Sequence, residues 1–384
     1  MTRIYLDNNA TTPLLPEVLE AMLPHLSSEF GNASSLHREG RVARGVLESA
    51  RERTAELLDA SPGQVIFTGG GTEANNIATF GLAGSVPCHV VTSSVEHPSV
   101  LGCFDVLATR GFQVSRLSVD SAGLVSPAEF ASTLRSDTKL ASVMLANNET
   151  GAIQPVPELA REARARGIRF HTDGVQAVGR IPVSFRTLGV SSLSLSAHKF
   201  HGPSGIGALI VEQPAQLEPV LVGGHQESGV RPGTEPVALA VGLAKALELA
   251  TNNLQAGACR VRQLRDRLEQ GLRERLEGAR LNGPVVDRVP NTVNLEFPGL
   301  DAQAAVMALD LLGLACSTGS ACASGAPEPS PVLLAMGLSP ERARSSIRFS
   351  LSRLTTEQEI KQAIEFVCRV VAQSCKRSGC AQNR

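Results

Sequence analysis

Lys199 carries an amine around which an active site can be built, because the surrounding segment 194–203 is rich in small residues and bounded by Gly and Pro. Asp173 follows the apolar run Ile168–Phe170, and a glycine-rich turn, 68–72, precedes a helical stretch. A lysine can form a Schiff base, an aspartate can pair with a pyridinium nitrogen, and amides at a helix start can bind phosphate. Each feature alone is usually structural: most lysines are surface residues, and such an aspartate commonly caps a helix. Together, in this order, they predict a site for pyridoxal 5'-phosphate.

Further polar side chains follow the predicted strands and could contact such a cofactor. Gln176 could donate to the phenolic oxygen of the ring, and Asn148 offers an amide within the segment 147–151. His97 starts a helix, where a flat imidazole could stack on the ring and move protons near neutral pH. A turn is the default interpretation of the asparagines, and most lone histidines are structural. The scarcity of aromatic residues, with no Trp and a single Tyr, favours His97 as the stacking group.

Two residues in the C-terminal part of the chain point to a substrate. Cys322 lies in a loop of small residues, about 317–330, which cannot pack a core and which we expect to be mobile. A thiol there indicates a nucleophile that takes sulfur from one molecule and hands it on. Arg348 lies mid-strand among apolar residues, where either a substrate carboxylate or an internal ion pair would satisfy it. Cys316, in contrast, fits a buried small hydrophobe.

The composition is that of an ordinary globular protein. The 384 residues carry a net charge of −1, which argues against bulk attraction to nucleic acid or to an anionic membrane. No apolar run is long enough to span a bilayer and the first residues show no signal-type apolar region, so we expect a cytoplasmic protein. The eight cysteines are dispersed and form no CxxC pair, so we expect neither a disulfide scaffold nor a metal site.

Short apolar runs alternate with helical stretches between residues 64 and 212. This alternation predicts an α/β fold with a mostly parallel seven-stranded sheet covered by helices on both faces. The expected strands are Gln64–Thr68, His89–Thr92, Gln113–Leu117, Lys139–Ala146, Ile168–Phe170, Leu193–Ser196 and Ile206–Val211. Ligands bind beyond the carboxyl ends of such strands, where Asp173 and Lys199 both fall. A long helical stretch, about 236–277, then leads to an α+β pattern from about residue 285.

Taken jointly, the motifs of the chain resemble one family nearly end to end. They are similar to the cysteine desulfurases of the NifS and IscS type, which are class V aminotransferases of the pyridoxal-phosphate fold type I. The motifs are Tyr5–Pro13, Phe30–Asn32, Gly71–Glu73, Glu96–His97, Asn147–Gly151, Asp173–Gln176, Ser196–Lys199, Arg231–Thr234, Gly319–Cys322 and Ser345–Arg348. The Gly-Ser-Ala-Cys loop resembles the group with the longer, mobile cysteine loop. Two departures are Ser204, where a lysine is usual, and the additional Cys316.

The resemblance implies a role for each matching residue. Lys199 would bind the cofactor, Asp173 and Gln176 would contact its ring, and the protein would be a homodimer. The residues implied in binding the phosphate are Gly71, Thr72, Ser196 and His198, with Thr234 reaching in from the partner subunit. The cofactor would also contact His97 and Asn148, and the substrate would be held by Asn32, Asn148 and Arg348. We expect a large cofactor-binding domain, 15–254, and a small α+β domain formed by 1–14 and 255–384 that carries the cysteine loop.

The implied function is that of an L-cysteine desulfurase. Such an enzyme converts L-cysteine to L-alanine, holds the sulfur as a persulfide on Cys322, and passes it to an acceptor protein of iron–sulfur cluster assembly or tRNA thiolation. Lys199 would move the Cα proton, and His97 would assist proton transfer at the substrate thiol. The alternative is a selenocysteine lyase or another class V lyase or transaminase; a transaminase would not need the Cys322 thiol. A non-catalytic sulfur-transfer subunit or scaffold would have no need of Lys199, Asp173 and His97.

Overall fold

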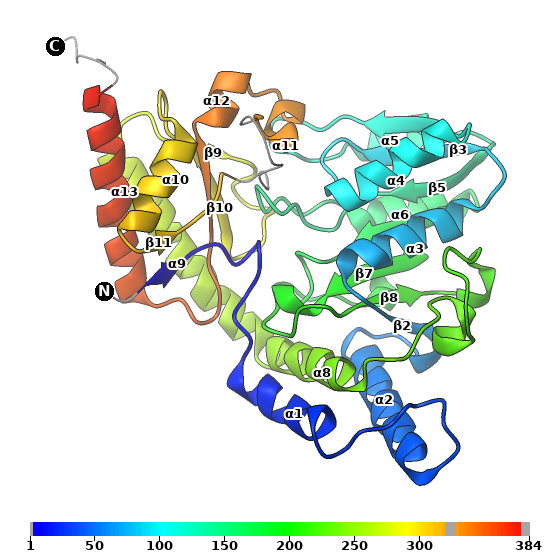
Figure 1. Cartoon of the computed structure of the whole chain (residues 1–384). Coiled ribbons are helices and arrows are strands. Elements are labelled where there is room, and N and C mark those ends of the chain that lie inside the picture. The colour runs from blue at the N-terminus through cyan, green and yellow to red at the C-terminus, as the bar shows by residue number, and fades with distance from the viewer. Residues whose placement is uncertain (1–2, 319–327, 378–384) are drawn as a thin grey trace.

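The computed structural model describes residues 3–318 and 328–377, which form two units lying side by side (Figure 1). The larger unit is built on a seven-stranded sheet with the order β2-β8-β7-β6-β5-β3-β4. Its strands are β2 (Val65–Thr68), β3 (His89–Ser93), β4 (Gln113–Leu117), β5 (Thr138–Ser142), β6 (Arg169–Asp173), β7 (Ser192–Ser196) and β8 (Gly207–Val211). Only β8 runs antiparallel to its neighbours, which confirms the prediction of a mostly parallel seven-stranded sheet.

The alternation of side chains along the strands decides which helices cover which face. Val65 and Phe67 of β2 belong to one buried apolar cluster, whereas Ile66 between them belongs to another. Successive side chains of a strand point to opposite faces of the sheet, so in a sheet covered on both faces they enter two different apolar clusters. One face is covered by α3 (Gly71–Ala83) and α4 (Pro98–Thr109). The other is covered by α2 (Arg38–Leu57), α5 (Pro127–Thr133), α6 (Val156–Ala165), α7 (Phe185–Leu188) and α8 (Val237–Thr251), with α1 (Pro16–Leu26) packed on α8.

The smaller unit combines an antiparallel sheet with three long helices. β10 (Thr292–Glu296) lies between β9 (Arg280–Asn282) and β12 (Ser346–Ser350). The helices are α9 (Leu254–Arg275), α10 (Ala302–Leu311) and α13 (Glu357–Arg377), with the short α11 (Pro331–Ala335) and α12 (Pro340–Arg344) at one end (Figure 1). Strand β1 (Ile4–Tyr5) pairs with β11 (Leu314–Ala315), so the start of the chain is part of this unit.

The buried apolar side chains form separate cores in the two units. The core of the smaller unit contains Ile4 and Leu6, and its other members all follow residue 260. The largest cluster of the other unit extends from Leu15 to Leu247, with Val289 as its one later member. This separation supports two domains, a large one formed by 15–254 and a small one formed by 1–14 and 255–384. The exact domain boundaries stay a prediction.

The long helical stretch predicted over about 236–277 consists of two helices. α8 ends at Thr251 and α9 begins at Leu254, because Asn253 between them has a φ of 54°. Asparagine adopts this left-handed conformation more readily than most residues, and two such residues in a row break the helix. Among the residues that the structure describes, none of the helices has the length and apolar character needed to cross a membrane.

A nearly buried ion pair ties α2 to the strand that leads into the predicted site. Arg51 donates from its two terminal nitrogens to Glu227 at 2.7 and 2.8 Å, and also to the Val65 carbonyl at 2.8 Å. Glu227 accepts a further hydrogen bond from the Phe67 backbone N–H at 2.8 Å. Its backbone φ is 46°, a strained value for glutamate, so these contacts hold the 226–229 turn in place. The pair thereby fixes β2, whose end becomes the glycine-rich turn.

Glu227→Ala is expected to lower the free energy of unfolding by about 3 kcal/mol or more, because it leaves a buried guanidinium without its carboxylate. Glu56→Ala is the matched control, since Glu56 pairs with Arg53 at the surface and its side chain is 68% exposed. It should change the free energy by less than about 1 kcal/mol. Urea unfolding followed by circular dichroism measures both. Equal losses would show that the buried pair does not stabilise the fold.

Candidate active site

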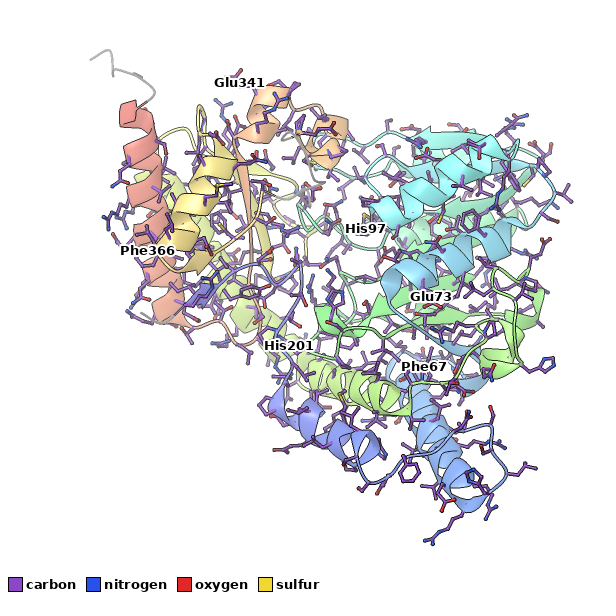
Figure 2. The ribbon with its side chains drawn as sticks, viewed as in Figure 1. Phe67, Glu73, His97, His201, Glu341 and Phe366 are labelled. Carbon is purple, nitrogen blue, oxygen red and sulfur yellow. The ribbon has the colours of Figure 1, made fainter. Side chains whose placement is uncertain are left out.

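The parallel strands of the large sheet end at one edge, and the predicted site residues gather there. Lys199 follows β7, Asp173 is the last residue of β6, and the glycine-rich turn follows β2. His97 lies just beyond β3, at the start of α4 and on the side toward the smaller unit (Figure 2). The segment 147–149 follows β5. The topology of the sheet therefore brings together residues that are far apart in the sequence.

A cavity of about 650 Å³ lies at this edge. Its lining includes Gly69, Gly70, Gly71, Thr72, Ser196, His198 and Ser204. The backbone passes closely here: Gly70 has a φ of 150°, and a Cβ on Gly71 would lie 2.8 Å from Val175 Cγ2. The first amides of α3 have no helical acceptor and carry partial positive charge, so this wall can bind a phosphate.

His198 lines the same cavity as a neutral imidazole. Its Nδ1 lies 3.0 Å from Thr11 Oγ1. Burial lowers the pKa of His198 to about 4, and the nearby Lys199 and Arg180 cations act in the same direction. A neutral ring can donate one hydrogen bond to a phosphate but contributes no charge to the site.

Lys199 lies in the short turn Ala197–Lys199, and its amine contacts the N-terminal segment of the chain. Nζ donates to the carbonyl oxygens of Asn9 and Ala10 at 2.6 and 2.7 Å. Burial lowers the pKa of this amine to about 8, and two nearby arginines act in the same direction. In a fraction of the molecules the amine is therefore neutral near neutral pH, and the neutral amine is the form that attacks a carbonyl carbon.

Asp173 is buried, and both of its carboxylate oxygens are held. Oδ1 accepts from the Val175 backbone N–H at 2.9 Å, so this residue does cap the turn that follows β6. Oδ2 accepts from Asn75 Nδ2 at 2.8 Å. A carboxylate fixed at both oxygens has the rigidity needed to pair with a ring nitrogen, and the capping interpretation and the cofactor interpretation are compatible.

Asn75 is a site residue that the sequence pattern does not reveal. Its Nδ2 donates to Asp173 and also to Ser99 Oγ at 2.9 Å, while its Oδ1 lies 3.1 Å from His171 Nε2. Burial lowers the pKa of His171 to about 4, so that ring is neutral. Asparagine is unfavourable inside a helix. Its presence on the buried face of α3 is the signal that could have singled it out.

His97 caps α4, and its hydrogen bonds fix the tautomer of the ring. Nδ1 accepts from the Ser99 backbone N–H at 3.1 Å and lies 2.8 Å from Ser99 Oγ. Because a backbone N–H can only donate, the ring proton is on Nε2. Solvent reaches the side chain, yet the surrounding protein removes enough hydration to lower its pKa, against the opposing charge of Asp173. His97 is therefore a neutral ring with one donor, Nε2–H.

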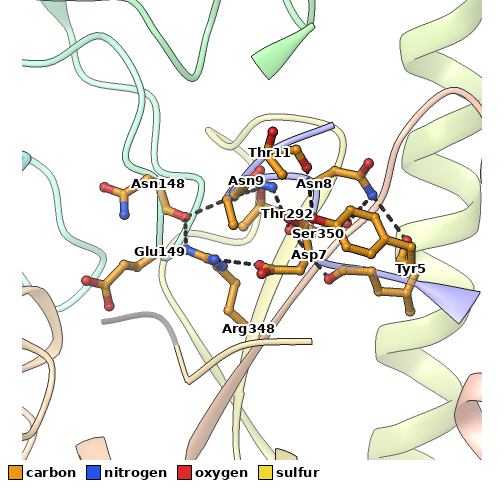
Figure 3. A network of polar contacts seen from close by, with 12 residues as sticks. Tyr5, Asp7, Asn8, Asn9, Thr11, Asn148, Glu149, Thr292, Arg348 and Ser350 are labelled. Atoms are coloured by element: carbon orange, nitrogen blue, oxygen red, sulfur yellow. Dashed lines mark hydrogen bonds and ion pairs between the residues drawn. The ribbon is translucent and has the colours of Figure 1, made fainter. Parts of the chain in front are cut away.

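Arg348 is nearly buried in β12, where an internal ion pair holds it (Figure 3). Nη2 donates to Asp7 Oδ1 at 2.7 Å, and Nη1 donates to the Asn148 carbonyl at 3.1 Å. The structure thus shows the internal ion pair that the sequence allows, and contact with a substrate carboxylate stays a prediction. Asn9 Nδ2 also donates to the Asn148 carbonyl, at 2.9 Å. The side-chain amide of Asn148 points away from Arg348 in Figure 3.

Gln176 joins the Lys199 cluster through its side chain. Its Nε2 donates at 3.1 Å to the Asn9 carbonyl, which also accepts from Lys199 Nζ. Its Oε1 accepts from Arg180, a buried residue that the sequence pattern does not single out. The predicted ring contact of Gln176 is thus compatible with its position beside the amine.

Thr234 and Asn32 lie away from this cluster. Thr234 is exposed in the loop before α8. Asn32 is exposed before α2, where its Oδ1 accepts from the Ser34 backbone N–H at 2.9 Å. The lining of the cavity includes neither residue. Exposure is compatible with the predicted contact of Thr234 with the cofactor of a partner subunit. That role and the predicted substrate contact of Asn32 stay predictions.

Cys322 lies outside the described residues, but the residues on either side of it are attached near the site. Ser317 exchanges two backbone hydrogen bonds with Arg348, at 3.1 and 2.6 Å. On the other side, Ser330 Oγ donates to Glu149 Oε2 at 2.5 Å. Cys316 is buried, which raises the pKa of its thiol to about 12. Because the thiolate is the nucleophile, Cys316 is an inert side chain, as its apolar sequence surroundings predict.

The residues at this edge fit pyridoxal phosphate. The cavity has the size of a typical ligand pocket, and its wall offers helix amides and hydroxyls to a phosphate. Lys199 presents an amine of lowered pKa for the aldehyde, and Asp173 presents a fixed carboxylate for the ring nitrogen. Within residues 3–318 and 328–377, no three His, Cys, Asp or Glu side chains are grouped so as to hold a metal ion.

Comparison with known proteins identifies the family. The model of the class V aminotransferases matches residues 4–363, so the chain belongs to this family of pyridoxal-phosphate enzymes, and pyridoxal phosphate is its cofactor. A solved NifS-like protein is 34% identical, with a TM-score of 0.91 over 97% of this chain and 100% of that chain. This similarity confirms the predicted fold type I.

Two further relatives are similar over almost the whole chain. A cysteine desulfurase of Cereibacter sphaeroides is 46% identical over 377 residues, which cover 97% of each protein. The solved structure of SspA in complex with cysteine is 33% identical, with a TM-score of 0.81 over 92% of this chain and 100% of that chain.

Gly71→Ala is expected to weaken the binding of pyridoxal phosphate by about tenfold or more, because overpacking at a tight contact costs about 1–3 kcal/mol. The added methyl group would press on Val175 at the wall of the cavity. Gly102→Ala in α4 is the control, since a Cβ there meets nothing within 4 Å. Absorbance titration of each cofactor-free variant measures the affinity. Equal affinities would mean that the start of α3 is not the phosphate site.

Proposed function

We propose that this chain is an L-cysteine desulfurase, which converts L-cysteine to L-alanine and holds the sulfur on Cys322 as a persulfide for an acceptor protein. The observation that carries the proposal is the Lys199 amine, with its lowered pKa, in a turn whose residues Ser196 and His198 line the cavity with the glycine-rich wall. The substrate is supported by the relative in Cereibacter sphaeroides that is named cysteine desulfurase and by the related SspA structure, which contains cysteine.

The described residues suggest how the cofactor would be held. Lys199 would bind its aldehyde carbon, Asp173 would pair with its ring nitrogen, and Gln176 would donate to its ring oxygen. The phosphate would be bound by Gly71, Thr72, Ser196 and His198, with Thr234 of a second copy; His97 and Asn148 would contact the ring. When bound, pyridoxal phosphate supplies an electron-withdrawing ring beside the substrate Cα, which stabilises negative charge there.

Protons are moved by Lys199 and His97. The neutral form of the Lys199 amine can remove the Cα proton of bound cysteine, and its pKa of about 8 makes this form available near neutral pH. His97 assists at the substrate thiol, where its Nε2–H is the donor left by the contacts of Nδ1. The Arg348 guanidinium would bind the substrate carboxylate, and Asn148 and Asn32 would contact the substrate elsewhere.

The sulfur step uses the Cys322 thiolate as the nucleophile. It attacks the substrate sulfur, so that a sulfur–sulfur bond forms and the bond between Cβ and sulfur breaks. The electron pair of the broken bond stays with the carbon part, which takes up a proton and leaves as alanine. In sum, one thiol and one cysteine give one persulfide and one alanine. The attachment of Ser317 and Ser330 near Arg348 and Glu149 supports this assignment.

An acceptor protein then takes the persulfide sulfur, in iron–sulfur cluster assembly or in tRNA thiolation. The homodimer and the cytoplasmic location stay predictions. A selenocysteine lyase or another class V lyase or transaminase is not favoured, because the relatives similar over nearly the whole chain are named cysteine desulfurases.

The two cysteines test the proposal. Cys322→Ser should still bind the cofactor and L-cysteine, but it should release alanine from cysteine about 1000-fold more slowly or worse, because a hydroxyl is a poor nucleophile toward sulfur. It could still release alanine from selenocysteine, whose carbon–selenium bond is weaker. Cys316→Ser should keep its turnover within about threefold, since a thiol of such raised pKa takes no part.

The measurement is alanine formed, together with the protein-bound persulfide detected by mass spectrometry. A Cys322→Ser variant that turns over cysteine normally, while Cys316→Ser is inactive, would mean that the nucleophile is wrongly assigned. If both variants released alanine from cysteine at the full rate, the result would contradict the desulfurase proposal itself.

A further inference from the structure

Arg180 is a buried cation whose hydrogen-bond acceptors, within the described part of the chain, are all uncharged. Nη1 donates to the side-chain and main-chain oxygens of Gln176. Nη2 donates to the carbonyls of Asn8 and Lys199 at 3.2 and 3.4 Å. Burial lowers the pKa of Arg180 to about 9, so the guanidinium still carries its charge near neutral pH. An unpaired buried charge costs free energy, so its position beside Lys199 calls for an explanation.

The first consequence of this position concerns the orientation of the Gln176 amide. A guanidinium has donors but no acceptor, so the Gln176 atom that faces Arg180 must be the oxygen. The amide NH₂ group is thereby turned the other way, toward the Asn9 carbonyl that Lys199 also contacts. With a leucine or methionine at position 180, the Gln176 oxygen would lose the donor that holds it, and only the Asn9 carbonyl would still favour this orientation of the amide.

The second consequence concerns the charge around the Lys199 amine. The charged groups near this amine are Arg180 and Arg348, which lower its pKa, and Asp173 and Asp7, which raise it; the neighbouring His97 and His198 are neutral. The two arginines are not equivalent. Arg348 is paired with Asp7 at 2.7 Å, whereas the acceptors of Arg180 carry no charge. Within the described residues, Arg180 is therefore the cation whose field on Lys199 is not balanced by a bonded carboxylate.

We propose that Arg180 is a positioning residue that fixes the Gln176 amide with its NH₂ toward the Asn9 carbonyl, which Lys199 also contacts, and places an unbalanced positive charge near the Lys199 amine. Gln176 is predicted to donate to the ring oxygen of pyridoxal phosphate, so Arg180 determines which atom Gln176 presents. The same positive charge favours the neutral form of the amine. The inference deepens the proposed function and rests on it only through the identity of the cofactor.

The electrostatic part is tested by the protonation of Lys199 in the full-length chain after removal of the cofactor. Each variant is labelled with acetic anhydride over a range of pH, and mass spectrometry of the Lys199 peptide gives the pH of half-maximal labelling. Arg180→Met is expected to raise this midpoint by about 1 pH unit, because it removes a cation near the amine. Arg180→Lys keeps the charge and should leave the midpoint within about 0.3 pH unit of the unsubstituted protein.

Arg186→Met is the matched control, because it removes the same charge from an exposed arginine on the same segment of the chain, with a side chain 78% exposed. Its midpoint should not move. A midpoint that is the same in Arg180→Met and Arg186→Met would overturn the electrostatic part. The measurement uses no cysteine, so a shifted midpoint in a chain without desulfurase activity would contradict the proposed function and leave this inference standing.

The orientational part is tested on the holoenzyme with Arg180→Lys, which keeps a charge but loses the forked contact with Gln176. The visible absorption band of the bound cofactor should shift in Arg180→Lys and in Gln176→Leu. Adding Arg180→Lys to the Gln176→Leu variant should then cause no further shift. If the lysine shifts the band as much without Gln176 as with it, Arg180 does not act through that amide. Because this test does not use Arg180→Met, it can be carried out even if that variant fails to fold.

Discussion

The partly buried Lys199 amine contacts two main-chain carbonyls and, within the described residues, no carboxylate, and the geometry of the site depends on how this amine is held. Two main-chain carbonyls, those of Asn9 and Ala10, accept its hydrogen bonds. The side chain of Asn9 in turn donates to the Asn148 carbonyl and to Thr292 Oγ1, which belong to different units of the fold. One short segment of the chain therefore fixes the amine and joins the two units around the site. A movement of the smaller unit would therefore displace the carbonyl groups that hold the amine.

Burial explains most of the electrostatics of this site. It lowers the pKa of Lys199 and of the surrounding histidines, and it raises the pKa of Glu96 to about 8. Lys199, His171, His198 and Glu96 are thus shifted toward their neutral forms. Arginine resists this effect because its ordinary pKa is so high, and Arg180, with its pKa lowered to about 9, keeps its charge near neutral pH. The charge of Arg180, which is not paired with a carboxylate among the described residues, and the amides at the start of α3 suit a cofactor with a phosphate and a substrate with a carboxylate.

The sequence predicted those parts of the molecule that local patterns determine. The seven strands of the large sheet follow from apolar runs separated by turn residues, and the positions of Lys199, Asp173 and His97 follow from the strands before them. Asn75, Arg180 and Asp7 could not be found in this way. Asp7 and Asn75 act through an ion pair and a hydrogen bond to residues distant in sequence, so a local pattern does not show their partners. Arg180 contacts Gln176 four residues before it, but its burial beside Lys199 depends on the tertiary fold. The break at Asn253 was missed because the apolar residues on both sides share one helical spacing.

The central claim is that Lys199 binds pyridoxal phosphate covalently, and reduction followed by peptide mapping tests it directly. The purified chain is treated with sodium borohydride and digested, and the peptides are searched for the added mass of the reduced cofactor. The account predicts this mass on the peptide that contains Lys199, and its loss in Lys199→Ala. The added mass on a different lysine of the unsubstituted chain, or its persistence in Lys199→Ala, would contradict the account.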